Sequence, residues 1–136
     1  IMPIEQQQID ILVKQIDQHY SELLQEVRED LTQNGGSEYV ELLGASGAES
    51  KEEAVRDLLW GLNSTLFGRH IREIRDIERA RMRISEGDYG VCSDCGDEIA
   101  FERLSAYPLA DRCVYCQSEH EHKHKHGKAH EIGIYV

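Results

Sequence analysis

Two short cysteine motifs decide the fold of the C-terminal part of this chain: Cys92-Ser93-Asp94-Cys95 and, 17 residues later, Cys113-Val114-Tyr115-Cys116. Each CxxC pair can present two thiolates from one tight turn, and two pairs at this separation can place four thiolates around one Zn²⁺. Gly90 and Gly96 flank the first pair, where a tight turn needs a permissive backbone. The motifs therefore predict one structural zinc ion bound by Cys92, Cys95, Cys113 and Cys116.

The alternative states of these cysteines are two disulfides, four free thiols or an iron site of the rubredoxin type. The first residues, Ile1 to Glu5, lack the basic and then apolar layout of a secretion signal, so we expect a cytoplasmic protein without disulfides. Four thiolates would leave no coordination position for water or substrate, so the predicted zinc is structural. The chain also lacks a nucleophile–base pattern and a phosphate-binding loop, and we expect no enzyme activity.

The composition excludes several classes of function. The 136 residues include 15 Lys and Arg against 26 Asp and Glu, which gives a formal net charge of −11. This excess of acid disfavours contact with a phosphate backbone, so we expect no direct, specific binding to DNA. No run of apolar residues is long enough to predict a membrane span. Charged residues make up 30% of the chain and aromatic residues 7%, which is typical of solvent-exposed helices.

Upstream of the cysteines, apolar residues recur at steps of three and four, the period of an amphipathic helix. A first such segment covers residues 4–31 and ends before Gly35-Gly36, a helix stop signal. A second covers residues 51–86. Two helices with facing apolar stripes and a connection rich in Gly and Ser predict an antiparallel coiled-coil hairpin over residues 1–87, with its tip near residues 34–54.

Two features complicate this hairpin. Gly61 and Gly68 interrupt the second helix, each at a cost of about 1 kcal/mol relative to Ala, although we expect the helix to continue through them. Residues 58–62 cover more of the helix circumference with apolar side chains than one partner helix requires. Either the helical segment 39–43 packs on this patch, or another protein does.

The sequence thus predicts a mainly α fold with three parts: the hairpin 1–87, a Cys₄ zinc-finger module at 88–118 and a C-terminal helix or tail at 119–136. In the tail, His alternates with Glu and Lys from Glu119 to His126. Alternating imidazoles can bind Ni²⁺ or Zn²⁺ weakly, and a solvated, partly disordered tail is the alternative.

The spacing of the module is more specific than its cysteines alone. It reads Cys92-x₂-Cys95-x₃-Ile99-x₃-Arg103-x₄-Pro108-x₄-Cys113-x₂-Cys116. In these positions, from Asp88 to Cys116, the chain resembles the DksA/TraR family of bacterial C4-type zinc-finger proteins. The preceding helical hairpin agrees with the family in order and size.

This resemblance implies a regulator that binds RNA polymerase rather than DNA. Members of the family insert their coiled coil into the secondary channel of the polymerase, which leads to the active-site magnesium. An Asp-x-x-Asp-x-Ala motif lies at the hairpin tip in the family, and Glu49, Glu52 and Ala54 occupy its positions here. Each Glu carries one more methylene than Asp, which displaces the carboxylate by about one carbon–carbon bond. For the neighbouring Glu53 we expect a capping box with Ser50.

Six arginines between Arg69 and Arg83 lie on the half of the second helix nearest the cysteines. Interleaved acids allow pairs within the helix, such as Arg72 with Asp76. The alternatives are contact with an acidic rim of the polymerase or with a phosphate-bearing effector. Family members that sense (p)ppGpp use basic residues just before the motif proline and just after the last cysteine.

Tyr107 and Gln117 stand at those two positions here, so the sequence predicts no (p)ppGpp site. A different class of function remains open for the whole chain. It could be a coiled-coil or zinc-ribbon interaction protein, or a weak nucleic-acid-binding module.

Overall fold

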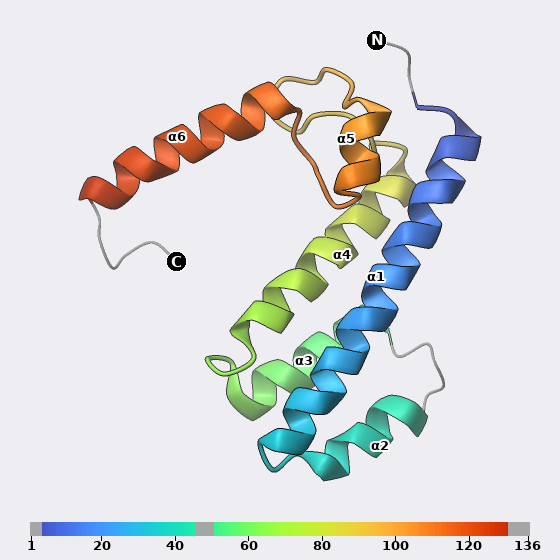
Figure 1. The fold of residues 1–136 in the computed structure, drawn as a ribbon, viewed down its shortest axis with the longest axis vertical. Helices are drawn as coiled ribbons and strands as arrows, with labels where there is room; N and C mark the ends of the chain where they lie inside the picture. Colours follow the sequence, from blue (N-terminus) through green and yellow to red (C-terminus); the bar gives the residue numbers. More distant parts are fainter. Residues whose placement is uncertain (1–3, 46–50, 131–136) are drawn as a thin grey trace.

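The computed structural model describes residues 4–45 and 51–130, and the side chains of residues 4–43 and 51–123. Six helices follow one another in this part of the chain (Figure 1): α1 (Gln6–Gln33), α2 (Ser37–Ala45), α3 (Glu52–Asn63), α4 (Gly68–Glu86), α5 (Phe101–Ala106) and α6 (Val114–His130). A single antiparallel bridge pairs Val91 with Glu98 within the described residues. The predicted mainly α fold class is confirmed.

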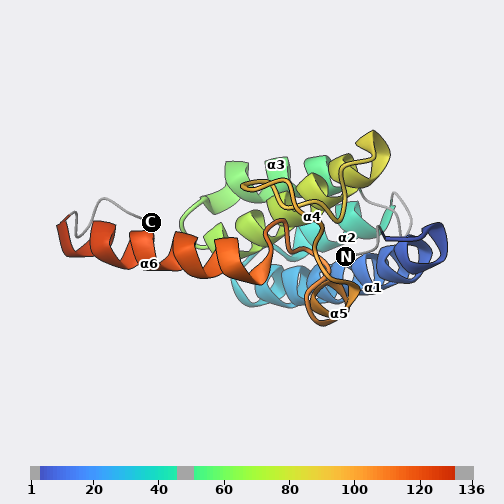
Figure 2. The same cartoon turned by 90° about the horizontal axis from the view of Figure 1, so that it is seen from above.

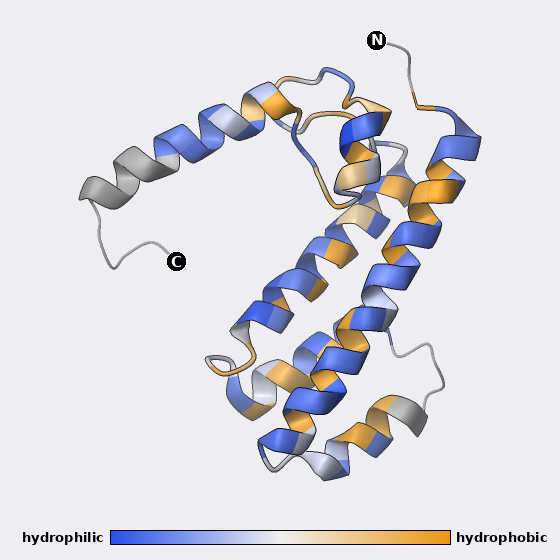
Figure 3. Ribbon diagram, in the orientation of Figure 1, coloured by the Kyte–Doolittle hydropathy of each residue, from blue (hydrophilic) through white to orange (hydrophobic). Residues whose placement is uncertain are grey.

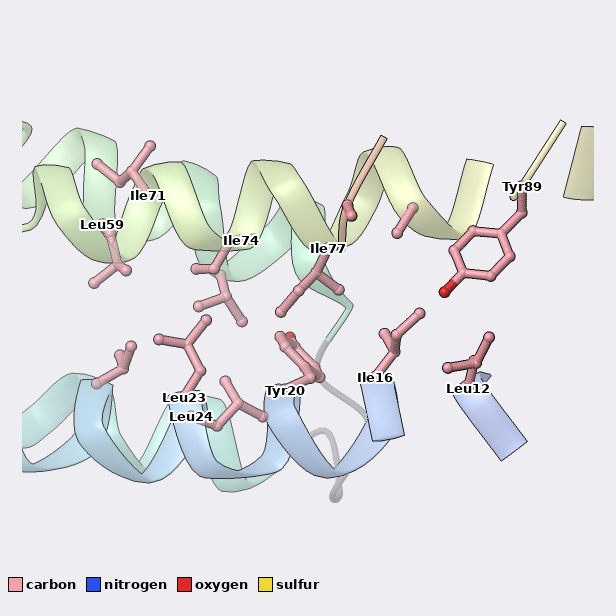
Figure 4. Packing of buried hydrophobic residues seen from close by; sticks show 14 of the residues in the cluster. Leu12, Ile16, Tyr20, Leu23, Leu24, Leu59, Ile71, Ile74, Ile77 and Tyr89 are labelled. Carbon is pink, nitrogen blue, oxygen red and sulfur yellow. The ribbon is translucent and has the colours of Figure 1, made fainter. Parts of the chain in front are cut away.

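Helices α1 and α4 lie side by side in antiparallel directions and form the stem of the molecule (Figures 1 and 2). Apolar and polar residues alternate along both helices (Figure 3), and the buried side chains of Ile74 and Ile77 lie between α4 and α1 (Figure 4). In Figure 4, Ile16 of α1 lies opposite Ile77 of α4, and both side chains are fully buried, as is Ile74. Burial of such aliphatic side chains stabilises the stem by about 1.5–3 kcal/mol each.

The predicted second helix, 51–86, is not continuous, because a turn at residues 64–67 separates α3 from α4. The Asn63 side-chain oxygen accepts hydrogen bonds from the backbone N–H groups of Thr65 at 3.2 Å and Leu66 at 2.8 Å, which stabilises this turn. Leu62 and Leu66 continued the periodic pattern in the sequence, yet they are 36% and 51% exposed. The chain therefore reverses, and α3 folds back along α4 (Figure 1).

Ion pairs determine where α3 lies along α4. The Arg56 guanidinium donates to both carboxylate oxygens of Glu78, at 2.7 and 3.3 Å. One turn earlier on α3, the Glu52 carboxylate lies 3.2 Å from Nε of Arg81. The start of α3 consequently lies beside the second half of α4. At the end of the bundle far from the cysteines, the chain turns at residues 34–36 and 64–67 (Figure 1).

The predicted capping box, apolar patch and hairpin tip each compare differently with the structure. Lys51 occupies the N-cap position of α3 and its side chain makes no capping hydrogen bond, while Ser50, which we expected to form a capping box with Glu53, lies outside the described residues. Within the apolar patch, Leu59 is fully buried, whereas Trp60 is 58% exposed with the Arg75 guanidinium 5.8 Å from its ring centroid. Residues 46–50, in the middle of the predicted tip, lie outside the described residues.

The cysteine module lies at the opposite end of the stem, against the first half of α1. The Gln15 side chain donates to the carbonyl of Ser105 at 3.1 Å, and the Tyr89 hydroxyl donates to the carbonyl of Pro108 at 2.8 Å. Beyond the module, α6 projects away from the bundle (Figures 1 and 2). Each helix in the described part of the chain is too short or too polar to cross a lipid bilayer.

Candidate metal centre

The four cysteine sulfurs form one cluster in the structure. All four Sγ atoms lie within 4.8 Å of one another, and those of Cys95 and Cys113 are 3.9 Å apart. A tetrahedral ion with Zn–S bonds of about 2.3 Å requires sulfurs roughly 3.8 Å apart. Cys92 and Cys116 are buried and Cys95 is exposed. The sulfur–sulfur distances in the cluster, up to 4.8 Å, are therefore close to those of a four-thiolate zinc site. Movements of about 1 Å or less would bring the sulfurs to the distances that a bound zinc ion requires.

The first cysteine pair lies in a tight turn closed by backbone hydrogen bonds. The N–H of Cys92 donates to the carbonyl of Asp97 at 2.7 Å, and the N–H of Gly96 donates back to the carbonyl of Cys92 at 3.0 Å. Gly96 has a φ of +79°, a conformation that side chains with a Cβ rarely adopt. The turn thus holds the two thiols of this pair on one side of the backbone.

Gly90 positions this turn against the stem. Its φ is +90°, and a Cβ at this residue would lie 3.0 Å from the side chain of Ile4, which precedes α1. Its carbonyl accepts a hydrogen bond from the N–H of Ile99 at 2.8 Å, next to the bridge between Val91 and Glu98. Glycine at residue 90 therefore allows the module to pack closely on the start of α1.

The second cysteine pair lies at the N-terminus of α6. The Cys113 sulfur accepts a hydrogen bond from the N–H of Cys116 at 3.4 Å, as an N-cap residue does. The partial positive charge of the helix N-terminus stabilises thiolates at this end of α6. The two pairs are tied together, since the N–H of Ser93 donates to the carbonyl of Asp111 at 2.8 Å and Arg112 donates to the Asp94 carboxylate at 2.9 Å.

The surroundings of Cys92 and Cys116 shift the pKa values of their thiols in opposite directions. Burial is the largest single influence on Cys92 and raises its pKa, but the backbone N–H groups of Cys95, Cys113 and Asp94 outweigh it and lower that pKa to about 6. Burial, followed by the neighbouring thiols, raises the pKa of Cys116. One thiolate is thus favoured and further negative charge is resisted, which is the imbalance that a divalent cation removes.

Several residues that are not ligands hold the module in place. Arg103, a fixed position of the motif, donates from Nε to the carbonyl of Arg112 at 2.8 Å, directly before Cys113. Arg83, which our sequence reasoning assigned only to the basic half of the helix, donates to the carbonyls of Asp88 and Val91. Arg83 lies at the end of the predicted helix, five residues before Asp88, and this position could have identified it as a residue that binds the backbone of the module.

Of the two predicted tip acids, only Glu52 lies within the described residues. Glu49 lies outside the described part of the chain, and Ala54 is exposed in the first turn of α3. The Glu52 side chain is only 19% exposed because it packs beside Arg81. Arg81 also donates to the Asp17 carboxylate at 2.9 Å, so this arginine connects α4 to both α1 and α3.

Ion pairs are made by Arg69 and Arg81 with acids of other helices, and by Arg79 with acids of α4 and of the cysteine module. Asp76, which we expected to pair with Arg72, lies 3.4 Å from Arg79 instead, and Arg79 also lies 3.9 Å from Asp111. Tyr107 and Gln117, the positions that are basic in (p)ppGpp-sensing relatives, line a polar cavity of about 380 Å³ between α4, α5 and α6.

The residues around the sulfur cluster match a known protein family. The model described as "Prokaryotic dksA/traR C4-type zinc finger" matches residues 87–122. This chain carries a DksA/TraR C4-type zinc finger. The resemblance predicted from the motif spacing is thereby confirmed, and the four clustered cysteines of the DksA/TraR finger are consistent with one structural zinc site.

This chain matches its curated relatives over only part of their length. The RNA polymerase-binding transcription factors DksA of Escherichia coli (strain K12) and Salmonella typhimurium (strain LT2) are 40% identical to this chain over 45 residues, which is 33% of this chain and 30% of theirs. An uncharacterized protein of Aquifex aeolicus is 35% identical over 79 residues, 54% of each chain. The structure of transcription factor DksA2 from Pseudomonas aeruginosa aligns with 84% of this chain and 89% of its own, at 23% identity and a TM-score of 0.43.

Proposed function

We propose that this protein is a zinc-binding regulator of bacterial transcription that binds RNA polymerase and not DNA. The observation that carries the proposal is the DksA/TraR finger at residues 87–122, which this chain shares with factors named for binding RNA polymerase. The net charge of −11 opposes binding to a phosphate backbone. A regulatory rather than enzymatic role and a cytoplasmic location belong to the same proposal.

In the proposed mode of binding, the helical hairpin enters the secondary channel and brings the carboxylates of Glu49 and Glu52 near the active site. Glu52 lies beside Arg81 in this structure, and Arg56 holds the next turn of α3 on Glu78. For Glu52 to reach a distant site on the polymerase, α3 must leave α4 and both ion pairs must break. The proposed complex therefore contains α3 in a different position.

The direct test measures binding of the purified protein to core RNA polymerase, in competition with a Gre-type factor that occupies the secondary channel. We expect saturable binding that the Gre-type factor displaces and that zinc chelation abolishes. Absence of binding would contradict the proposal. Salt-sensitive binding to DNA without polymerase would instead favour a nucleic-acid-binding module.

The proposed role of the carboxylates has a separate test in transcription initiation from a sensitive promoter in vitro. Glu49→Ala and Glu52→Ala should abolish the effect on initiation while binding to polymerase persists. Glu38→Ala is the control, because Glu38 is an exposed acid in the first turn of α2. Wild-type effects from both variants would refute the role of these carboxylates, and the binding test would stand unaffected.

We expect no response to (p)ppGpp. The arginines that line the polar cavity are engaged within the protein: Arg79 with Asp76, Arg112 with Asp94, and Arg103 with a backbone carbonyl. A polyphosphate would have to displace these partners and would meet the carboxylates in their place. Addition of (p)ppGpp should change polymerase binding by less than about twofold, in the range of a weak surface ion pair. A larger change would contradict this expectation.

A second candidate is a helical interaction protein with a different partner, and the exposed apolar side chains of α3 and the following turn favour it. Trp60 is 58% exposed and Leu66 51% exposed, and such side chains are common at protein interfaces. The polymerase test separates the two candidates. If Trp60→Ala abolishes binding to polymerase as well, this patch is part of the same interface.

A further inference from the structure

Three contacts between charged or aromatic side chains join α3 to α4 in a regular antiparallel order (Figure 1). Their α3 members are four residues apart and their α4 members three residues apart, the spacings that place side chains on one face of a helix. One face of α4 therefore carries a row of alternating charge, and α3 complements it along its length. The pairs are Glu52 with Arg81, Arg56 with Glu78, and Trp60 with Arg75.

The apolar contact between α3 and the stem is small by comparison. Val55 and Leu59, one turn apart, are the buried residues of α3. The helix has 12 residues, and a helix of this length is marginal in water without tertiary contacts. Elements with few buried apolar side chains open at a lower free energy than the rest of a protein. The charged row therefore has a large share in holding α3 on the stem.

The first pair of the row is incompletely satisfied while α3 is attached. Nε of Arg81 is buried and makes no hydrogen bond among the described residues, although a Glu52 carboxylate oxygen lies 3.2 Å away. A buried polar atom without a hydrogen bond raises the free energy of the state that buries it. Detachment of α3 would expose this nitrogen to water. It would also free the Glu52 carboxylate, whose side chain is 19% exposed while α3 is attached.

We propose that these three pairs form a latch, which keeps Glu52 inactive while α3 lies on α4 and frees it when α3 detaches. This inference rests on the proposed function, in which the Glu52 carboxylate acts at the polymerase. Arg56 and Glu78 are positioning residues of the latch, because they hold α3 one turn beyond Glu52. A chain with a weakened latch should act on polymerase at a lower concentration, because a larger fraction of its molecules already has Glu52 free.

The test reverses the charges of the middle pair in the full, zinc-loaded chain. Arg56→Glu and Glu78→Arg each place like charges opposite each other, whereas the double variant restores an ion pair of opposite polarity. Each single variant should speed amide exchange in α3 by about tenfold or more, the loss expected for a hydrogen bond between charged groups. It should lower the concentration for half-maximal effect on initiation in parallel. The double variant should return both values towards wild type.

Arg69→Glu is the matched control, because it reverses an exposed charge of α4 whose partner, Glu26, lies on α1. It should leave exchange in α3 within about twofold of wild type. Wild-type exchange in both single variants would overturn the latch, and so would a double variant that exchanges as fast as the single variants. Faster exchange without a stronger effect on initiation, in variants that bind polymerase, would overturn its regulatory role. Absence of polymerase binding in the wild type and in every variant would overturn the proposed function and, with it, that role.

Discussion

The helical stem and the cysteine module are held together by different forces. In the stem, α1 and α4 bury rows of aliphatic side chains, among them Ile16, Ile74 and Ile77 with no exposed surface. The module has few buried apolar residues, chiefly Ile99 and Leu104, and its turns depend on backbone hydrogen bonds around the sulfur cluster. A module this small cannot bury enough apolar surface to fold alone. The two regions should therefore fail under different perturbations.

The largest expected effect comes from loss of a metal ligand. Cys95→Ser should abolish zinc binding and remove the protection of backbone amides in residues 88–118 from hydrogen exchange, because structural zinc contributes about 10–16 kcal/mol in small zinc-binding peptides. The amides of α1 should stay protected. Zinc content and hydrogen exchange by mass spectrometry measure the two responses.

The matched control for this change is Ser93→Ala, in the same turn but with an exposed side chain. It should retain one zinc per chain. If the module kept its amide protection in Cys95→Ser, its fold would not depend on the metal. If α1 lost its protection too, the two regions would form one cooperative unit.

The opposite perturbation is a cavity in the stem. Ile74→Ala should lower the free energy of unfolding by about 2–5 kcal/mol, the usual cost of truncating a buried aliphatic side chain. Zinc content should not change. Met82→Ala is the control on the same helix, because Met82 is 58% exposed. A loss of zinc in Ile74→Ala comparable to the loss in Cys95→Ser would show that the module cannot hold its metal without the intact stem.

The sequence predicted these two regions to different extents. The spacing of the cysteines and the apolar period of α1 identified the sulfur cluster and a first helix at 4–31, close to the observed Gln6–Gln33. The period also continued through Leu62 and Leu66, and there it failed. Periodicity records where apolar residues stand but not whether a partner helix covers them. The hydrogen bonds of the Asn63 side chain stabilise a turn that ends the helix, although the apolar period continues through this segment.

The same limit applies to the candidate site. Ligand positions can be predicted from spacing because a metal requires particular atoms at particular separations. The pair of Arg56 with Glu78 and that of Glu52 with Arg81 join residues more than 20 positions apart, through a reversal of the chain that local pattern does not reveal. The sequence therefore identified Glu52 as a candidate acid, but it did not identify Arg81 as its partner or Arg56 as the partner of Glu78.

The ion pairs of Arg81 add a charged contact to the apolar contacts of Val55 and Leu59 that hold α3 on the stem. Arg81→Ala leaves the mostly buried carboxylate of Glu52 and the exposed carboxylate of Asp17 without this cation, and it removes a guanidinium 6.0 Å from the Tyr20 ring centroid. We expect a loss of about 1–3 kcal/mol, as for a hydrogen bond to a charged group, and faster amide exchange in α3.

Arg69→Ala is the control for this change, because Arg69 and its partner Glu26 are both mostly exposed, and it should cost at most about 0.5 kcal/mol. If Glu52 acts in the proposed complex, Arg81→Ala should also strengthen the effect on initiation. Unchanged exchange in α3 would show that apolar contacts alone hold this helix on the stem.

The smallest expected effect lies where the two regions meet. Tyr89→Phe removes the hydrogen bond from the buried Tyr89 hydroxyl to the carbonyl of Pro108, and should cost about 1 kcal/mol at neutral pH. Burial raises the pKa of Tyr89 from 10.0 to about 12.

Below pH 10 both the folded and the unfolded chain keep the proton, so the hydroxyl contributes fully to stability. As the pH rises from 10 towards 12 the unfolded chain loses its proton first, and this contribution disappears. Denaturant unfolding at pH 8 and pH 11 should therefore show the difference between Tyr89→Phe and wild type shrinking or changing sign. A constant difference would mean that this hydroxyl is open to water, and that stem and module are joined less closely than the structure shows.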